Sequence, residues 1–147
     1  MSATILRPGE GEAHSVGASS VVLKATGETT GGTFFVSETT IEAGFPGPPP
    51  HVHGELHDAF NVLEGTLTLR VGDEVVEAGP GTFVCVPPGV VHAFSNHNDA
   101  PVRFLNMNTP AGWENYMRDL GRLPADRLPT PEEIGAIAAR YDFRPVG

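Results

Sequence analysis

The stretch PPPHVHGELHDAFNVLEG, residues 48–65, decides how the rest of the chain is interpreted. It holds three of the six histidines, and His51 and His53 are separated by a single residue. Side chains two residues apart on a strand project to the same face, so these imidazoles would lie side by side. Such a pair suits a transition metal, although solvated strand edges carry the same pattern without one.

A second stretch, GTFVCVPPGVVHAFSN at residues 81–96, adds His92 within another strand–turn pattern. If a barrel brings this histidine beside His51 and His53, three imidazoles can bind one metal. Three protein ligands leave coordination positions open, as catalytic metal sites require.

Short β-rich runs separated by Gly and Pro turns surround these two stretches. SSVVLKAT (19–26) predicts a first strand, GETTGG (27–32) a turn, and TFFVSETTIEAG (33–44) a second strand rich in β-formers. FPGPPP (45–50) is a stiff connection that no helix could use. Because the alternation of strand and turn continues over 51–108, we expect an antiparallel barrel or sandwich.

The C-terminal part of the chain predicts two short helices. An i, i+3, i+4, i+7 apolar stripe is formed by Trp113, Tyr116, Met117 and Leu120. Further on, Thr130 and Glu133 form a capping box, with Pro131 at the first helical position. A second apolar stripe follows at Ile134, Ile137, Ala138 and Tyr141. We expect both helices to pack on the barrel or on a partner subunit.

Composition limits the class of partner. The 147 residues include nine basic and eighteen acidic side chains, a formal charge of −9, which disfavours binding to nucleic acid. No apolar run suggests a signal peptide or a membrane span, so a cytoplasmic location is expected. The single cysteine, Cys85, forms no intramolecular disulfide and is predicted to be a buried, inert thiol.

At this point the residues resemble those of the cupin superfamily. Its second motif, Gly-x5-Pro-x-Gly-x2-His-x3-Asn, is matched at every position by Gly81, Pro87, Gly89, His92 and Asn96. Its first motif, Gly-x5-His-x-His-x3–4-Glu-x6-Gly, is matched by His51, His53 and Gly65. Two departures stand out: Gly44 lies one residue too early, and Asp58 occupies the position of the Glu.

The resemblance implies an all-β cupin jelly-roll (double-stranded β-helix) barrel with short C-terminal α-helices. We expect an N-terminal arm over residues 1–18, the barrel over 19–110 and a C-terminal helical extension over 111–147. The chain also resembles the small quercetinase-like cupins. The resemblance to the family implies a homodimer, and the N-terminal strand and the two C-terminal helix stripes are the expected contact surfaces.

The resemblance also implies a ligand set of His51, His53, His92 and Asp58. Because Asp is about 1.3–1.5 Å shorter in reach than Glu, Asp58 binds directly only if the backbone moves inward. Otherwise it acts through a water, or as a catalytic base when not ligated. His57 is the alternative fourth ligand, since it fits the shorter motif spacing. The metal would be Fe, Ni, Mn, Cu or Zn, and an all-histidine set would favour Ni, Cu or Zn over Mn.

Strand parity then predicts the lining of a substrate pocket. These residues share a face with the expected ligands or with each other on the last strand: Phe60, Val62, Phe94, Phe104, Asn106 and Asn108. Ordinary core packing is the alternative role for each of them. Asn96 is expected to be a turn residue that bonds its own backbone.

The function implied by the resemblance is a metal-dependent dioxygenase, with an enol or diketone small molecule chelated to the metal and dioxygen as co-substrate. Two alternatives stay open, because one fold hosts many activities. The first is a non-catalytic cupin that binds metal or a small molecule. The second is an isomerase, with or without a metal.

Overall fold

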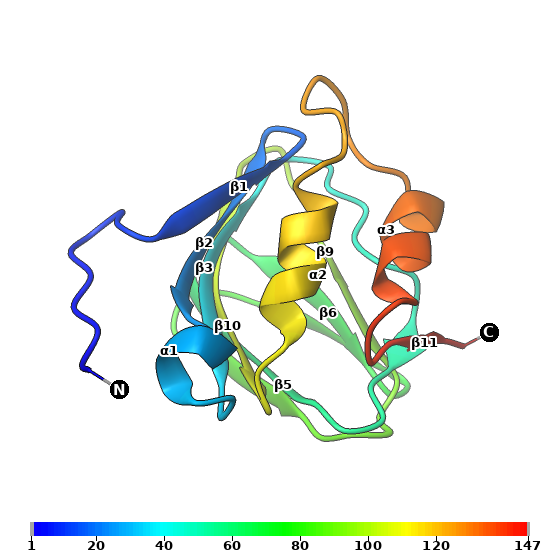
Figure 1. Cartoon of the computed structure of the whole chain (residues 1–147). Coiled ribbons are helices and arrows are strands. Elements are labelled where there is room, and N and C mark those ends of the chain that lie inside the picture. The colour runs from blue at the N-terminus through cyan, green and yellow to red at the C-terminus, as the bar shows by residue number, and fades with distance from the viewer. Residues whose placement is uncertain (1, 147) are drawn as a thin grey trace.

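Two antiparallel sheets form the body of the protein in the computed structural model, which describes residues 2–146 (Figure 1). In spatial order, the six-stranded sheet contains β1 (Glu12–Val16), β2 (Ser19–Ala25), β3 (Phe35–Ile41), β10 (Val102–Thr109), β5 (His57–Glu64) and β8 (Phe83–Val86). The five-stranded sheet contains β11 (Arg144–Pro145), β4 (His51–Val52), β9 (His92–Ser95), β6 (Leu67–Val71) and β7 (Glu74–Ala78). The predicted jelly-roll architecture with short C-terminal helices is confirmed.

The core lies between the two sheets because each long strand buries alternate residues. Along β3 and β10, buried positions alternate with half-buried ones, as expected for strands with one face toward a core. Phe35, Phe60 and Phe104 come from the six-stranded sheet and Leu67 and Leu69 from the other, and all five are almost fully buried. These side chains hold the sheets together beneath the candidate site.

The N-terminal region is more ordered than an extended arm. Residues 12–16 form β1, which pairs antiparallel with β2. Gly17, with φ of +61°, allows the tight turn between the two strands, where a side chain would be strained. The predicted turn at 27–32 contains a short helix, α1 (Gly27–Thr30), because Thr26 and Thr29 form a reciprocal capping box.

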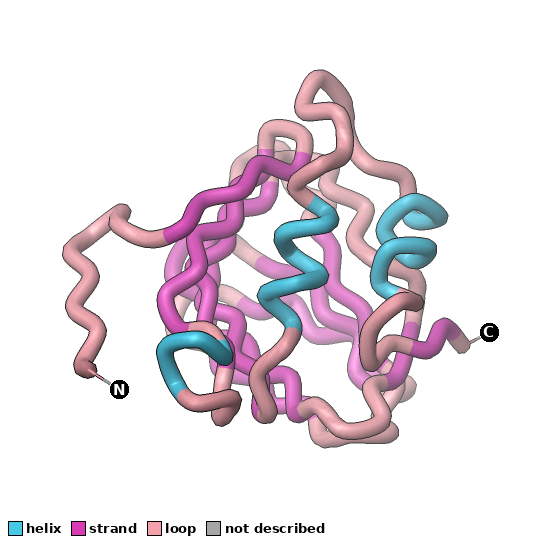
Figure 2. Tube along the Cα trace, in the orientation of Figure 1, coloured by secondary structure: helices cyan, strands magenta, loops and turns pink. Residues whose placement is uncertain are grey.

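Two C-terminal helices, α2 (Trp113–Leu120) and α3 (Pro131–Ala138), lie across the open end of the barrel (Figures 1 and 2). The predicted stripe on α2 is buried, as are Ile134 and Ala138 on α3. The capping box of Thr130 and Glu133 is present. Both apolar stripes therefore pack within the chain, on the barrel. No helix in residues 2–146 is long and apolar enough to cross a membrane.

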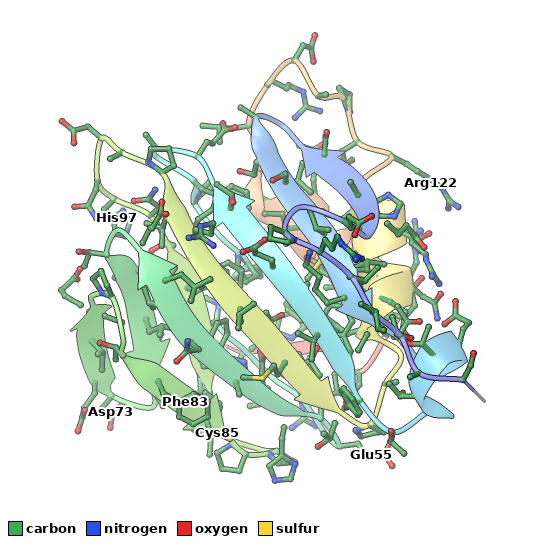
Figure 3. All side chains as sticks on the ribbon, turned by 90° about the vertical axis from the view of Figure 1, so that its left-hand side faces the viewer. Glu55, Asp73, Phe83, Cys85, His97 and Arg122 are labelled. Carbon is green, nitrogen blue, oxygen red and sulfur yellow. The ribbon has the colours of Figure 1, made fainter. Side chains whose placement is uncertain are left out.

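The prediction that Cys85 is a buried thiol is wrong. Cys85 lies on β8, the edge strand of the six-stranded sheet, and its side chain is exposed. Val86 points into the core, so by alternation Cys85 and Phe83 project outward (Figure 3). The strand was identified correctly, but its apolar sequence hid which of the two faces is solvated.

Candidate metal centre

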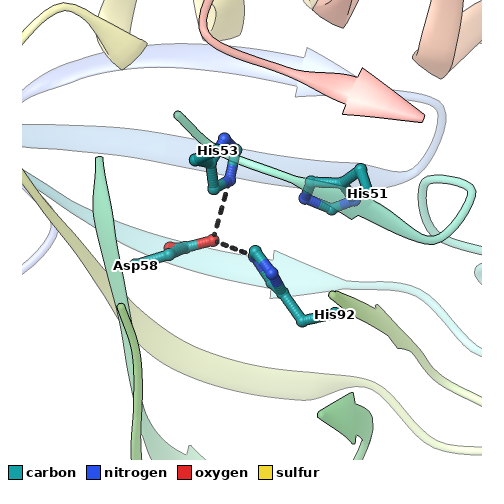
Figure 4. A group of neighbouring side chains, drawn as sticks. All are labelled: His51, His53, Asp58 and His92. Atoms are coloured by element: carbon teal, nitrogen blue, oxygen red, sulfur yellow. Dashed lines mark hydrogen bonds and ion pairs between the residues drawn. The ribbon is translucent and has the colours of Figure 1, made fainter. Parts of the chain in front are cut away.

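Four side chains from separate parts of the chain converge inside the barrel: His51, His53, Asp58 and His92 (Figure 4). One nitrogen or oxygen from each lies within 4.8 Å of the others, and all four residues are buried. His51 on β4 lies opposite His92 on β9, whereas Asp58 is on β5 in the other sheet. Closure of the barrel therefore assembles the group.

Each histidine ring is oriented by a hydrogen bond to a main-chain carbonyl. The Nδ1 atoms of His51, His53 and His92 bond, in that order, to the carbonyls of Pro49, Asp142 and Val90. The first and third of these bonds measure 2.9 Å and 3.0 Å. Because a carbonyl oxygen only accepts, Nδ1 carries the proton in each neutral ring. The three Nε2 lone pairs are left free to bind a cation.

Asp58 is held in place by two amides from β10. Its Oδ1 accepts hydrogen bonds from Asn106 and Asn108, each 2.8 Å long. Its Oδ2 lies 3.0 Å from Nε2 of His92 and 3.4 Å from Nε2 of His53. The shorter acid thus reaches the histidines, while the two asparagines fix the orientation of its carboxylate.

These separations suit a cation at the centre of the group. With Nδ1 protonated in each ring, the Nε2 atoms of His53 and His92 and the Oδ2 atom of Asp58 all present lone pairs. A proton or a metal ion must therefore lie between these nitrogens and the oxygen. Two ligands each about 2.1 Å from one metal are about 3.0 Å apart at a right angle and about 3.4 Å apart at a tetrahedral angle. The donor set and its spacing therefore fit a divalent transition metal.

The pKa shifts reflect the same attraction for positive charge. Burial alone would raise the pKa of Asp58, but hydrogen bonds from Nε2 of His53 and His92, which exist only when those rings carry a second proton, outweigh it and hold that pKa well below its usual range. Burial alone would lower the pKa of His53, but hydrogen bonding and charge from Asp58 raise it. Burial, followed by the neighbouring His92, lowers the pKa of His51 to about 3. At neutral pH Asp58 is thus ionised and His51 is neutral.

His57 lies outside the group. It is exposed at the start of β5, one residue from Asp58 and on the opposite face of the strand. The structure does not bring its ring to the other histidines, so an all-histidine set is not formed.

A cavity extends from the group toward α2 and α3. Its volume is about 50 Å³. His51, His53 and Asp58 form its polar end. The remaining wall is largely apolar and includes Ile41, Phe45, Trp113, Met117, Ile134 and Phe143. Among the described residues that line it there is no lysine or arginine.

Only two of the six predicted pocket residues line this cavity, namely Phe94 and Asn106. Phe60, Val62 and Phe104 are correctly placed on the inner face, but they are core residues below the cavity, each 1% exposed. Asn108 does not line the cavity; its side-chain amide donates a hydrogen bond to Asp58. Parity gives the face of a strand and not the depth, which explains the three misplaced apolar residues.

Several residues that line the cavity or contact the histidines were not predicted from the sequence to do so. Trp113 and Met117 were recognised as a helix stripe, but nothing local showed that this helix covers the barrel end. Asp142 and Phe143 belong to no motif, yet Asp142 contacts His53 and Phe143 stacks on His51. Asn96 behaves as predicted, since its side chain accepts from the Asn98 amide within its own turn.

Comparison with known proteins places this architecture in a family. A family model described as "Cupin domain" matches residues 37–108. Quercetin 2,3-dioxygenase from Bacillus subtilis (strain 168) is 33% identical over 92 residues, which are 61% of this chain and 26% of that protein. The chain therefore aligns with about a quarter of the length of this curated relative.

Solved structures share the fold. KdgF from Halomonas sp. superposes with a TM-score of 0.67 at 13% identity, over 78% of this chain and 99% of that one. A sugar phosphate isomerase from a cupin superfamily, from Silicibacter pomeroyi, gives a TM-score of 0.55 at 29% identity, over 64% of this chain and 60% of that one. The first similarity speaks to the fold alone.

Proposed function

This chain belongs to the cupin superfamily, and from that premise we propose that it is a metal-dependent enzyme acting on a small molecule. The reaction proposed is that of a dioxygenase, which adds both atoms of dioxygen to an enol or diketone substrate. The observation that carries the proposal is the buried convergence of three imidazole Nε2 atoms and one carboxylate oxygen at the end of an apolar cavity.

The proposed metal ligands are His51, His53, His92 and Asp58, with Fe, Ni, Mn, Cu or Zn as the ion. When bound, a divalent metal supplies Lewis acidity that favours the enolate form of a chelating substrate. Asp58 is ionised at neutral pH, and when its Oδ2 is not ligated that atom is the one that would accept the enol proton. Asn106 and Asn108 keep Oδ2 directed at this position.

The cavity wall supports a substrate without strong charge. Apolar side chains, among them Phe94, Trp113 and Phe143, exclude water from the polar end of the cavity. Apart from the metal itself, a phosphate or a second carboxylate would find no cationic side chain among the described lining residues. This favours an enol or diketone over the class of substrate named for the sugar phosphate isomerase.

The similarity to quercetin 2,3-dioxygenase supports the same reaction class, although it covers only part of that protein. The alternatives are a cupin that binds metal or a small molecule without turnover, and a metal-dependent isomerase. Neither alternative predicts consumption of dioxygen.

Two measurements test the proposal. Elemental analysis of protein purified without added metal is expected to find a transition metal, or the apoprotein is expected to take one up from solution. Less than about a tenth of a metal per chain, not restored by iron, nickel, manganese or zinc, would contradict the metal site. Oxygen uptake by the loaded protein against a panel of flavonols and diketones then separates a dioxygenase from a binder or an isomerase, with His92→Ala as the metal-deficient control.

A further inference from the structure

Asp142 lies between α3 and β11, in a segment that returns from the helices to the barrel. Its Oδ1 accepts a hydrogen bond from the Gly54 amide at 2.6 Å, and its Oδ2 accepts from Glu55 and Leu56 at 2.8 Å and 2.9 Å. These three amides form the turn that leads from His53 to β5, where Asp58 lies. One carboxylate therefore fixes the connection between two of the proposed ligands.

The main chain of Asp142 contacts a proposed ligand directly. Its carbonyl oxygen accepts the hydrogen bond from Nδ1 of His53. This bond fixes the ring rotation and keeps Nε2 directed at Asp58, 3.4 Å away. Both oxygens of the Asp142 carboxylate are occupied by amides, so the residue acts on the site through His53 and the turn.

The residues after Asp142 contact a second histidine. The ring of Phe143 stacks on that of His51, with centroids 4.1 Å apart and planes 22° from parallel. In β11, Pro145 pairs with His51, and the amide of Val146 bonds to the carbonyl of Pro50 at 2.9 Å. The tail segment, residues 142–146, thus supports two of the three histidines from outside the ligand set.

We propose that Asp142 is a positioning residue, which holds His53 and the Gly54–Leu56 turn in the orientation required for metal binding. This inference rests on the metal site proposed above. Because coupling between two binding events is reciprocal, docking of the tail segment and binding of the metal stabilise each other. Outer partners of a metal-bound histidine commonly change metal affinity by about 10–100-fold, and that is the effect expected here.

A purely structural role for Asp142 makes a different prediction. If the Asp142 carboxylate only holds the tail segment against the barrel, loss of the carboxylate lowers the stability of the fold but leaves the coordination of a bound metal unchanged. The absorption spectrum of bound Co²⁺ separates the two roles, because it responds to the number and orientation of the ligands.

The test compares the wild type with Asp142→Asn and with a matched control, Glu133→Gln. The Asn side chain can offer only one of its two terminal atoms as an acceptor to the three amides. Glu133 also accepts a main-chain amide hydrogen bond, from Thr130 at 3.0 Å, and lies in the same C-terminal region without contacting the histidines. Circular dichroism checks folding, competition with a chromophoric chelator gives the dissociation constant for Co²⁺, and absorption gives the coordination spectrum.

We expect Asp142→Asn to bind Co²⁺ about 10–100-fold more weakly with an altered spectrum, and Glu133→Gln to match the wild type in both. Should Asp142→Asn fail to fold, Asp142→Glu, which keeps the charge but displaces it, carries the same comparison. A folded variant with wild-type affinity and spectrum overturns the positioning role and leaves the metal site intact. A wild type that binds no Co²⁺ or other transition metal overturns the metal site itself, and the positioning role with it.

Discussion

Replacing Asp58 with asparagine is expected to stabilise the metal-free protein and to abolish its response to metal. The amide oxygen introduced by Asp58→Asn can still accept the hydrogen bonds from Asn106 and Asn108. The amide nitrogen then takes the place of Oδ2, 3.0 Å from Nε2 of His92 and 3.4 Å from Nε2 of His53. In the wild type with neutral histidines, Oδ2 and each Nε2 are both acceptors. In the variant the amide nitrogen is a donor, so each of the two contacts becomes a hydrogen bond.

The gain can be sized from these distances. A neutral hydrogen bond contributes about 0.5–1.5 kcal/mol, and the longer contact with His53 falls at the low end, so the total is about 1–2 kcal/mol. For a domain of this size the melting temperature should rise by roughly 2–8 °C. The pKa of His53 is raised on folding, so its protonation stabilises the wild type below about pH 6.5 and that contribution is lost as pH rises through the folded value. The advantage of Asp58→Asn should therefore grow with pH.

Thermal unfolding followed by circular dichroism at pH 9 and pH 6, with a chelator or with excess Ni²⁺, measures both effects. At a metal concentration 100 times the dissociation constant, the wild type gains about 2.7 kcal/mol and the variant gains almost nothing. The order of stability should thus reverse when metal is added.

The matched control is Asp73→Asn, which makes the same charge change in the exposed turn between β6 and β7 and should leave the metal response intact. The reasoning is refuted if Asp58→Asn is more than about 1 kcal/mol less stable than the wild type in chelator at pH 9. It is equally refuted if Ni²⁺ raises both melting temperatures by the same amount.

Three further outcomes follow from the same geometry. Metal affinity should fall by up to about tenfold per pH unit below the raised pKa of His53, because the metal must displace the proton from that ring, and should level off above it. Competition with a chelator from pH 6 to pH 9 measures this pH dependence. His57→Ala should bind metal like the wild type while His92→Ala loses it, since His57 is exposed outside the group; equal losses in elemental analysis would contradict that placement. Native protein should react fully with a thiol reagent at Cys85, and a reaction that requires denaturant would mean that the edge strand is covered.

The expected ligand set came from the resemblance to the two cupin motifs. His51, His53, Asp58 and His92 were expected to come together, and the structure gathers these four. Local rules account for part of this convergence, because residues two apart share a strand face, as His51 and His53 do. Metal binding by the four residues stays a prediction. The reach of Asp58 could not be predicted, since it depends on Asn106 and Asn108, which lie 48 and 50 residues further along the chain.

The elements that cover the site, α2, α3 and the tail segment, could not be predicted either, because their contacts also join distant parts of the chain. The hydrogen bond between Asp142 and Gly54 joins residues 88 positions apart, and no spacing rule reaches that far. The stripe of Trp113 and Met117 indicates a buried helix face but does not name the surface that buries it. Long-range packing therefore decides which apolar residues become cavity wall and which become core.

Homodimer formation stays a prediction. The strand and helix stripes expected to support it pack against other elements of the same chain. β2 lies between β1 and β3 inside the sheet, and the stripes of α2 and α3 face the barrel of the same chain. The outer faces of the sheets, including the one near Phe83, which is 58% exposed, remain available to a dimer (Figure 3). Sedimentation analysis of the wild type decides whether any dimer forms.

The covering of the cavity links access to the site with its geometry. The cavity measures only about 50 Å³, whereas a cavity that binds a benzene ring measures about 150 Å³, so an aromatic enol can reach the histidines only if α2, α3 or the tail segment moves. The tail segment cannot move freely, because Asp142 bonds to His53 and Phe143 stacks on His51. Opening by that route would release the rings of two proposed ligands. A shift of α2 leaves both of these contacts in place and separates only the ring of Trp113 from that of His53. Movement of α2 or α3 therefore disturbs the proposed ligands less than movement of the tail segment.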